Sequence, residues 1–319
     1  MVLLLQYTII FASVLCLVAL GGCFSEHSGV INLGLEGIMV MGALGGAVTM
    51  FLLPAGSAKI VIVLATTLAA ILVGMLFSCL LAVACINFKA DQTLIGTAMN
   101  LLATAAATVF VRAMNTSINP DNVSTSIQYI QEKKAFLKYF GKFEFNWFML
   151  MAVILLVASY ILLYKTRFGL RLMACGENPQ AADSLGINVH KMRYLGVGLS
   201  GFLAGVGGFT FSMTTANMTS NGDVAGYGFL ALAVMIFGNW TPLNIAFGSI
   251  LFGLFKCIAA TYSTLDINGD GVFMLNELGI SPYVYRMLPY IITLVVLAFT
   301  SKNSRVPKAE GIPYDKGQR

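Results

Sequence analysis

The sequence predicts an all-α integral membrane protein, a polytopic bundle of about nine (eight to ten) transmembrane helices with one short helix outside the membrane. Composition is the first reason, since 58% of the residues are hydrophobic and only 10% are charged, against about 25% charged residues in soluble domains. The mean hydropathy of +0.82 agrees with this class. The third reason is that apolar runs near the length of a spanning helix follow one another along most of the chain.

Nine apolar runs approach the roughly 20 residues that a helix needs to cross the hydrocarbon core. They cover residues 3–22, 30–53, 60–86, 93–113, 145–164, 194–215, 227–239, 243–262 and 284–300. The second run is rich in glycine and the seventh is short, so we expect broken or partial crossings there, covered by protein. The chain is thus predicted to form one membrane domain over residues 1–302, followed by a tail at 303–319.

Basic residues predict the orientation, because Lys and Arg concentrate in cytoplasmic loops. If the polar segment at 174–193 is cytoplasmic, that side collects the larger basic set, although the loop at about 114–144 on the other side is also basic. We therefore expect the N-terminus outside and the C-terminus in the cytoplasm. Because the chain has no basic cluster with interleaved aromatic residues, the sequence gives no support for nucleic-acid binding.

A polar segment, ACGENPQAADSLGINVHKMR (Ala174–Arg193), interrupts the apolar sequence. Asn178 and Pro179 mark a helix start, since Asn accepts hydrogen bonds from free amides and Pro fits the first helical position. Gly186 marks the end of a helix of about two turns, which is too short to be stable alone. We expect one small apolar face, suited to a partner's groove, that contains Ala181, Ala182 and Leu185. The alternative is a solvated loop with one helical turn.

Four ordered motifs resemble one transporter family. They are SGVINLGLEGIMVMGA (Ser28–Ala43), GLRLMACGENPQAADSLGINVHKMRYLGVGLSGFLAGVGG (Gly169–Gly208), ALAVMIFGNWTPLNIAFGSILFG (Ala231–Gly253) and AFTSKNSRVPKAEGIPYDKGQR (Ala298–Arg319). Together they resemble the permease subunits of bacterial ABC importers for simple sugars and nucleosides, most closely the nucleoside branch. The resemblance implies a path for nucleosides, or a related simple sugar, through the bacterial cytoplasmic (inner) membrane.

The resemblance also implies partners. An ABC ATPase subunit would receive the coupling loop at about 166–193, a second permease of similar but different sequence would complete the path, and an external substrate-binding lipoprotein would deliver the cargo. The coupling residues would be Asn178, Pro179, Ala181, Ala182, Leu185 and Gly186. The sequence contains no GxxxxGK[ST] loop, so we expect the partner to use ATP and this chain to bind no cofactor and to be no enzyme.

One face of the fourth apolar run is polar. Its members, spaced within an arc of roughly 80° on a helix, are Thr93, Thr97, Asn100, Thr104 and Thr108. In hydrocarbon such a stripe should face protein or a water-filled cavity, and its groups suit hydrogen bonds to a neutral polyol such as ribose. Thr97, Asn100 and Thr104 are therefore candidates for the substrate path; the alternative is that they tie neighbouring helices together.

The second run places Asn32 and Glu36 one turn apart, and a carboxylate inside a membrane is a functional-site candidate. Both residues could line the substrate path, or Glu36 could accept hydrogen bonds at a broken helix. As a proton or sodium site, Glu36 would instead make the chain an ion-coupled secondary transporter, which the capped polar segment argues against. Lys256 could pair with Glu36, but we expect it to reach for the outer surface. A third alternative is a membrane enzyme, which the two histidines do not support.

The segment DINGDGVFMLNE (Asp266–Glu277) matches the calcium-loop pattern D-x-[DN]-x-[DN]-G-x5-E. Its side-chain ligands for Ca²⁺ would be Asp266, Asn268, Asp270 and Glu277. Met274 offers no ligand at position nine, and Gly279 and Pro282 disfavour the exit helix of an EF-hand. The sequence thus predicts, at most, a weak calcium site on the outer side.

Overall fold

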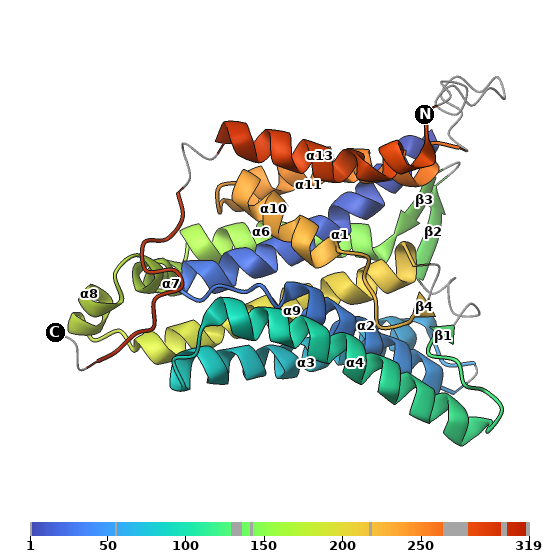
Figure 1. Cartoon of the computed structure of the whole chain (residues 1–319), viewed down its shortest axis with the longest axis horizontal. Coiled ribbons are helices and arrows are strands. Elements are labelled where there is room, and N and C mark those ends of the chain that lie inside the picture. Colours follow the sequence, from blue (N-terminus) through green and yellow to red (C-terminus); the bar gives the residue numbers. More distant parts are fainter. Residues whose placement is uncertain are drawn as a thin grey trace.

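The computed structural model describes residues 2–54, 56–128, 136–140, 143–216, 219–263, 280–300 and 305–316. Within these ranges most of the chain is helical (Figure 1). The helices are α1 (Val2–His27), α2 (Leu35–Leu52), α3 (Lys59–Ala82), the π-helical η1 (Val83–Asn87), α4 (Gln92–Ile118), α6 (Trp147–Tyr164), α7 (Arg167–Glu177), α8 (Pro179–Ser184), α9 (Val189–Thr214), α10 (Tyr227–Phe237), α11 (Pro242–Thr261) and α13 (Pro282–Thr300). Two short antiparallel pairs join β1 (Ile127–Gln128) to β4 (Thr219–Ser220) and β2 (Leu137–Phe140) to β3 (Phe143–Asn146).

Each of the nine predicted apolar runs contains a helix, which confirms the all-α membrane fold. Among the described residues, seven helical spans are long and apolar enough to cross a membrane: α1, α2, α3 with η1, α4, α6, α9 and α11. The seventh predicted run is the 11-residue α10, and the ninth is the 19-residue α13. The seventh run is therefore a partial crossing, as its length predicted.

The second run begins irregularly, as its glycine content predicted. Residues 28–34 form no helix, and α2 starts only at Leu35. Side chains from other helices bind this irregular segment: Asn32 Nδ2 donates to Ser200 Oγ at 2.8 Å, and Ile31 N donates to Gln92 Oε1 at 2.7 Å. This irregular start agrees with the broken crossing expected in the glycine-rich second run, and contacts with other helices stabilise it in place of hydrogen bonds within a helix.

The long helices α1 and α9 form the centre of the bundle (Figure 1). Helices α2 and α3 pack on α9, whereas α10 and α11 pack on α1. Small residues allow the closest approach, since a Cβ added to Gly42 of α2 would clash with the Gly205 backbone of α9. Each half of the chain thus packs its shorter helices against the central helix of the other half.

The two chain termini lie at opposite ends of the bundle, with the C-terminus beside α8 (Figure 1). We call the end of the bundle where the C-terminus lies beside α8 the α8 end. Residues 305–316 of the tail cross it and bind three elements. Arg305 N donates to Asn239 Oδ1 at 2.6 Å, Ala309 N donates to Gly176 O at 2.8 Å, and Asp315 Oδ2 forms an ion pair with Lys89 Nζ at 2.8 Å. The tail therefore connects the α10–α11 turn, the end of α7 and the segment after η1.

Candidate functional sites

Glu36 lies at the starts of two helices, α2 and α10. Its Oε1 accepts a hydrogen bond from Gly226 N at 2.8 Å, and its Oε2 accepts one from Gly228 N at 2.6 Å. Amides in the first turn of a helix have no partner within that helix, and the positive end of the helix dipole favours a carboxylate. Glu36 therefore caps α10, which is the structural role at a broken helix that the sequence left open.

Asn100 of α4 holds the start of α2. Its Oδ1 accepts from Gly37 N at 2.8 Å, and its Nδ2 donates to Leu33 O at 2.9 Å. Asn100 lies eight residues after Gln92, the first residue of α4, so α2 begins about 12 Å beyond the start of α4, at about 1.5 Å per residue. The amide retains one further donor and acceptor site, so its contact with a substrate stays a prediction.

The threonines of the stripe lie on the exposed side of α4, with Thr93, Thr97 and Thr104 exposed and Thr108 half-buried. Thr97 Oγ1 donates to Thr93 O at 3.1 Å, and Thr108 Oγ1 donates to Thr104 O at 2.7 Å. These two hydroxyls bind their own helix, so they do not tie α4 to a neighbouring helix of this chain. The exposed threonines are left available to water or to another subunit, whereas Asn100 ties α4 to α2, which is the alternative role.

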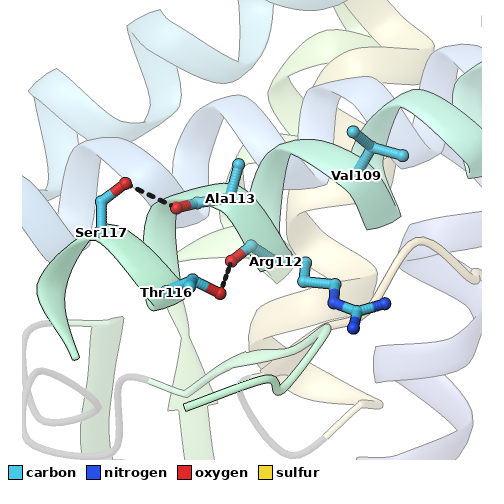
Figure 2. A pocket seen from close by; sticks show the side chains of 5 residues that line it. All are labelled: Val109, Arg112, Ala113, Thr116 and Ser117. Carbon is cyan, nitrogen blue, oxygen red and sulfur yellow. Dashed lines mark hydrogen bonds between the residues drawn. The ribbon is translucent and has the colours of Figure 1, made fainter. Parts of the chain in front are cut away.

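The exposed face of α4 ends in an open, nearly flat patch formed by Val109, Arg112, Ala113, Thr116 and Ser117 (Figure 2). Thr116 Oγ1 donates to Arg112 O at 2.9 Å and Ser117 Oγ donates to Ala113 O at 2.7 Å, while the Arg112 guanidinium extends away from the helix. All five residues belong to α4, so this patch is a face of one helix and encloses no site by itself. Arg112 follows Thr108 by four residues, a spacing that could have added it to the predicted stripe.

Lys256 is a second charged residue near Glu36, the neighbour that the sequence offered as its alternative. Lys256 Nζ of α11 lies 4.5 Å from the centroid of the Tyr227 ring and 5.5 Å from that of Tyr290. The Lys256 ammonium lies within electrostatic range of Glu36. The exposed carboxylate of Asp223, in the loop before α10, also lies within electrostatic range of Glu36. Lys256 thus lies among aromatic rings, and the expectation that it reaches for the outer surface was wrong. Its being the sole charged residue of α11 was the signal available in the sequence.

The predicted short helix of the polar segment is present as α8. Asn178 Oδ1 accepts from Ala181 N at 3.0 Å, and Pro179 is the first helical residue. Gly186 has a φ of +80°, in the left-handed region that glycine adopts without strain, and its amide donates to Asp183 O at 2.9 Å. Both ends of the helix therefore use the residues that predicted them.

The apolar residues of α8 do not share one exposed face. Ala181 is exposed and Leu185 is 81% exposed, but Ala182 is only 2% exposed. Successive residues lie about 100° apart around a helix, so Ala182 turns inward when Ala181 turns outward. The surface that α8 offers to a partner therefore contains Ala181 and Leu185, while Ala182 packs against this chain.

The predicted calcium site lies outside the described residues, so Asp266, Asn268, Asp270 and Glu277 stay a prediction. Within the described ranges no group of three or more His, Cys, Asp or Glu side chains is placed to hold a metal ion.

Comparisons with known proteins agree along nearly the whole chain. The family described as "Branched-chain amino acid transport system / permease component" matches residues 4–297. The guanosine ABC transporter permease NupQ of Bacillus subtilis is 37% identical over 323 residues, which cover 98% of this chain and 96% of that protein. The nucleoside ABC transporter permease NupC of Lactococcus lactis is 38% identical over 314 residues, covering 97% and 96%. A putative glucose ABC transporter permease of Haloferax volcanii, TsgC13, is 30% identical over 305 residues, covering 93% and 91%.

Proposed function

This chain belongs to the family of permease components of branched-chain amino acid transport systems, and we propose that its cargo is a nucleoside. It is a multi-pass membrane protein, the permease subunit of an ABC importer, and it translocates its cargo rather than converting it. The observation that carries the nucleoside proposal is the identity of 37% and 38%, over almost the full chain, with permeases named for guanosine and for nucleosides. The 30% identity with a putative glucose permease makes a related simple sugar the second candidate.

The proposed partners are an ABC ATPase, a second permease of different sequence and an external binding lipoprotein. Docking of the ATPase on the coupling loop is supported by the two capped ends of α8 and by the exposure of Leu185. The exposed polar stripe of α4 supports a path shared with the second permease, because polar side chains at this depth are unfavourable in contact with lipid. ATP would be bound and hydrolysed by the partner.

The proposed orientation places the α8 end, with the C-terminus, in the cytoplasm and the N-terminus outside the bacterial inner membrane. It is supported by the positions of the two termini at opposite ends of the bundle and by the basic residues near α8. An ion-coupled secondary transporter is disfavoured, because both oxygens of Glu36 accept hydrogen bonds from backbone amides of α10.

The proposal is tested by reconstituting the permease pair with its ATPase and binding protein in proteoliposomes. We expect ATP-dependent uptake of labelled guanosine or adenosine, and none with an ATPase that binds but does not hydrolyse ATP. Uptake of glucose or ribose in place of nucleosides would contradict the proposed cargo. Uptake driven by a proton or sodium gradient without ATP would contradict the importer.

A further inference from the structure

Five elements meet around Glu36. The loop before α10 touches the stripe of α4, since a Cβ added to Gly222 would lie 2.9 Å from Thr108 Oγ1 and 3.2 Å from Thr104 O. The same loop ends at Gly226, whose amide binds Glu36 of α2. The ring of Tyr227, the next residue, lies under the Lys256 ammonium of α11, and the Tyr290 ring of α13 lies on another side of that ammonium. Segments far apart in the sequence thus gather charged, hydroxyl and aromatic groups in one place.

This group lies near the middle of the apolar layer. Thr104 follows the first residue of α4 by twelve positions in a helix of 27 residues, so it lies about 18 Å along a helix of about 40 Å, at about 1.5 Å per residue. At that depth Asp223 is exposed, and Glu36 and Lys256 are half-buried. Charged side chains at mid-depth face water or protein rather than lipid. This side of the chain is therefore covered by a hydrated path or by another subunit.

Lys256 carries N–H donors that do not form ordinary hydrogen bonds with the two aromatic rings. An ammonium carries three N–H donors, while an aromatic face attracts it only electrostatically. Among the described residues, Lys256 forms no ion pair with Glu36 closer than 4.0 Å, so Glu36 acts on Lys256 only at longer range, and the Asp223 carboxylate acts on Glu36 as a like charge. A hydroxyl group between them could accept from the ammonium and donate to a carboxylate.

We propose that Lys256, Glu36 and Asp223 form a subsite that binds the vicinal diol of the cargo's ribose. Lys256 donates to one hydroxyl, and the carboxylates accept from the diol. Glu36 keeps its bonds to α10 while doing so, because each carboxylate oxygen has a second lone pair. Tyr290, 47% exposed, offers its ring to the apolar face of the sugar. This inference rests on the proposed nucleoside cargo and specifies which part of the nucleoside the permease recognises.

The test compares adenosine with 2′,3′-dideoxyadenosine, which lacks both hydroxyls. The full importer is reconstituted, and uptake rates are measured with binding protein saturated by either nucleoside, so that the preference of the binding protein does not enter the ratio. We expect the wild type to carry adenosine several-fold faster. Lys256→Met should reduce this ratio to about one by slowing adenosine alone, and Lys256→Arg should retain part of it. Lys59→Met, an exposed lysine at the start of α3, is the matched control and should keep the full ratio.

A second variant keeps the test decisive if the Lys256→Met protein does not assemble. Asp223→Asn changes an exposed loop residue and keeps the oxygen that accepts from Ala225 N, and it should also lower the ratio. Equal rates for the two nucleosides in the wild type, or an unchanged ratio in assembled Lys256→Met or Asp223→Asn, would overturn the subsite while leaving nucleoside transport established. If the wild type carries neither nucleoside, the proposed cargo is what fails.

Discussion

The carboxylate of Glu36 and the amide of Gly228 are 192 positions apart in sequence and form a hydrogen bond of 2.6 Å. This bond fixes the start of α10 to the start of α2. Both helices begin inside the apolar layer, and a side chain from another helix satisfies the free amides at the start of α10.

Removing the Glu36 carboxylate should destabilise the protein. Glu36→Ala leaves two amides at the start of α10 without their acceptor, and bonds to a charged group contribute roughly 1.5–3 kcal/mol each, so we expect a loss of about 3–6 kcal/mol. Glu36→Gln retains one acceptor oxygen and should lose less. Thermal unfolding in detergent measures the order wild type, Gln, Ala; equal melting temperatures for all three would refute the capping role.

The stripe of α4 should be accessible to water in the assembled importer. In a protein whose native cysteines have been replaced, Thr97→Cys and Thr104→Cys should react with a charged, water-soluble thiol reagent, and the rate should change when the ATPase is trapped with ATP. Ala103→Cys, at a position with 0% exposure, and Leu102→Cys, on the apolar side of α4, are the controls. The path lies elsewhere if all four positions are equally protected in both states.

The coupling surface of α8 should depend on Leu185 rather than on Ala182. Leu185→Glu changes a side chain that is 81% exposed, so the permease should reach the membrane at the normal level while ATP-dependent uptake falls at least roughly tenfold through loss of an apolar contact. Ala182→Glu would bury a charge and should lower the amount of folded protein instead. Normal uptake by assembled Leu185→Glu would remove Leu185 from the ATPase interface.

Docking of the tail should weaken as the pH rises. Burial raises the pKa of Glu310 to about 7, although its hydrogen bond with the neighbouring Glu26 carboxyl acts in the opposite direction. The docked tail therefore binds a proton more tightly than the free tail does, so docking is strongest below the ordinary carboxyl pKa and is lost progressively up to about pH 7. Hydrogen exchange of the 305–316 segment, corrected for the intrinsic rate, should show less protection at pH 8 than at pH 5. Glu310→Gln should remain protected at both values, and a pH dependence that persists in this variant would exclude Glu310 as its cause.

Features set by local sequence could be predicted, and those set by distant contacts could not. Apolar runs give spanning helices by length alone, and Asn178 with Pro179 starts α8 through bonds within one turn. The start of α2 at Leu35 depends on Asn100 of α4, and the position of Lys256 depends on rings in α10 and α13. Neither relation leaves a periodic signal in either segment.

The tail also affects how force would move through the molecule. Its bonds run from Gly176, at the end of α7, through Ala309 and Arg305 to Asn239, just after α10, and the other end of α10 is fastened to Glu36. If α8 moved and pulled on α7, the force would therefore pass through the tail to α10 and act along the α10 axis. Helix α9 would not first have to bend. The tail would thus link the surface on which the proposed ATPase acts to the interior of the bundle. Cutting the tail would leave only a longer route through the chain for a force applied at α8.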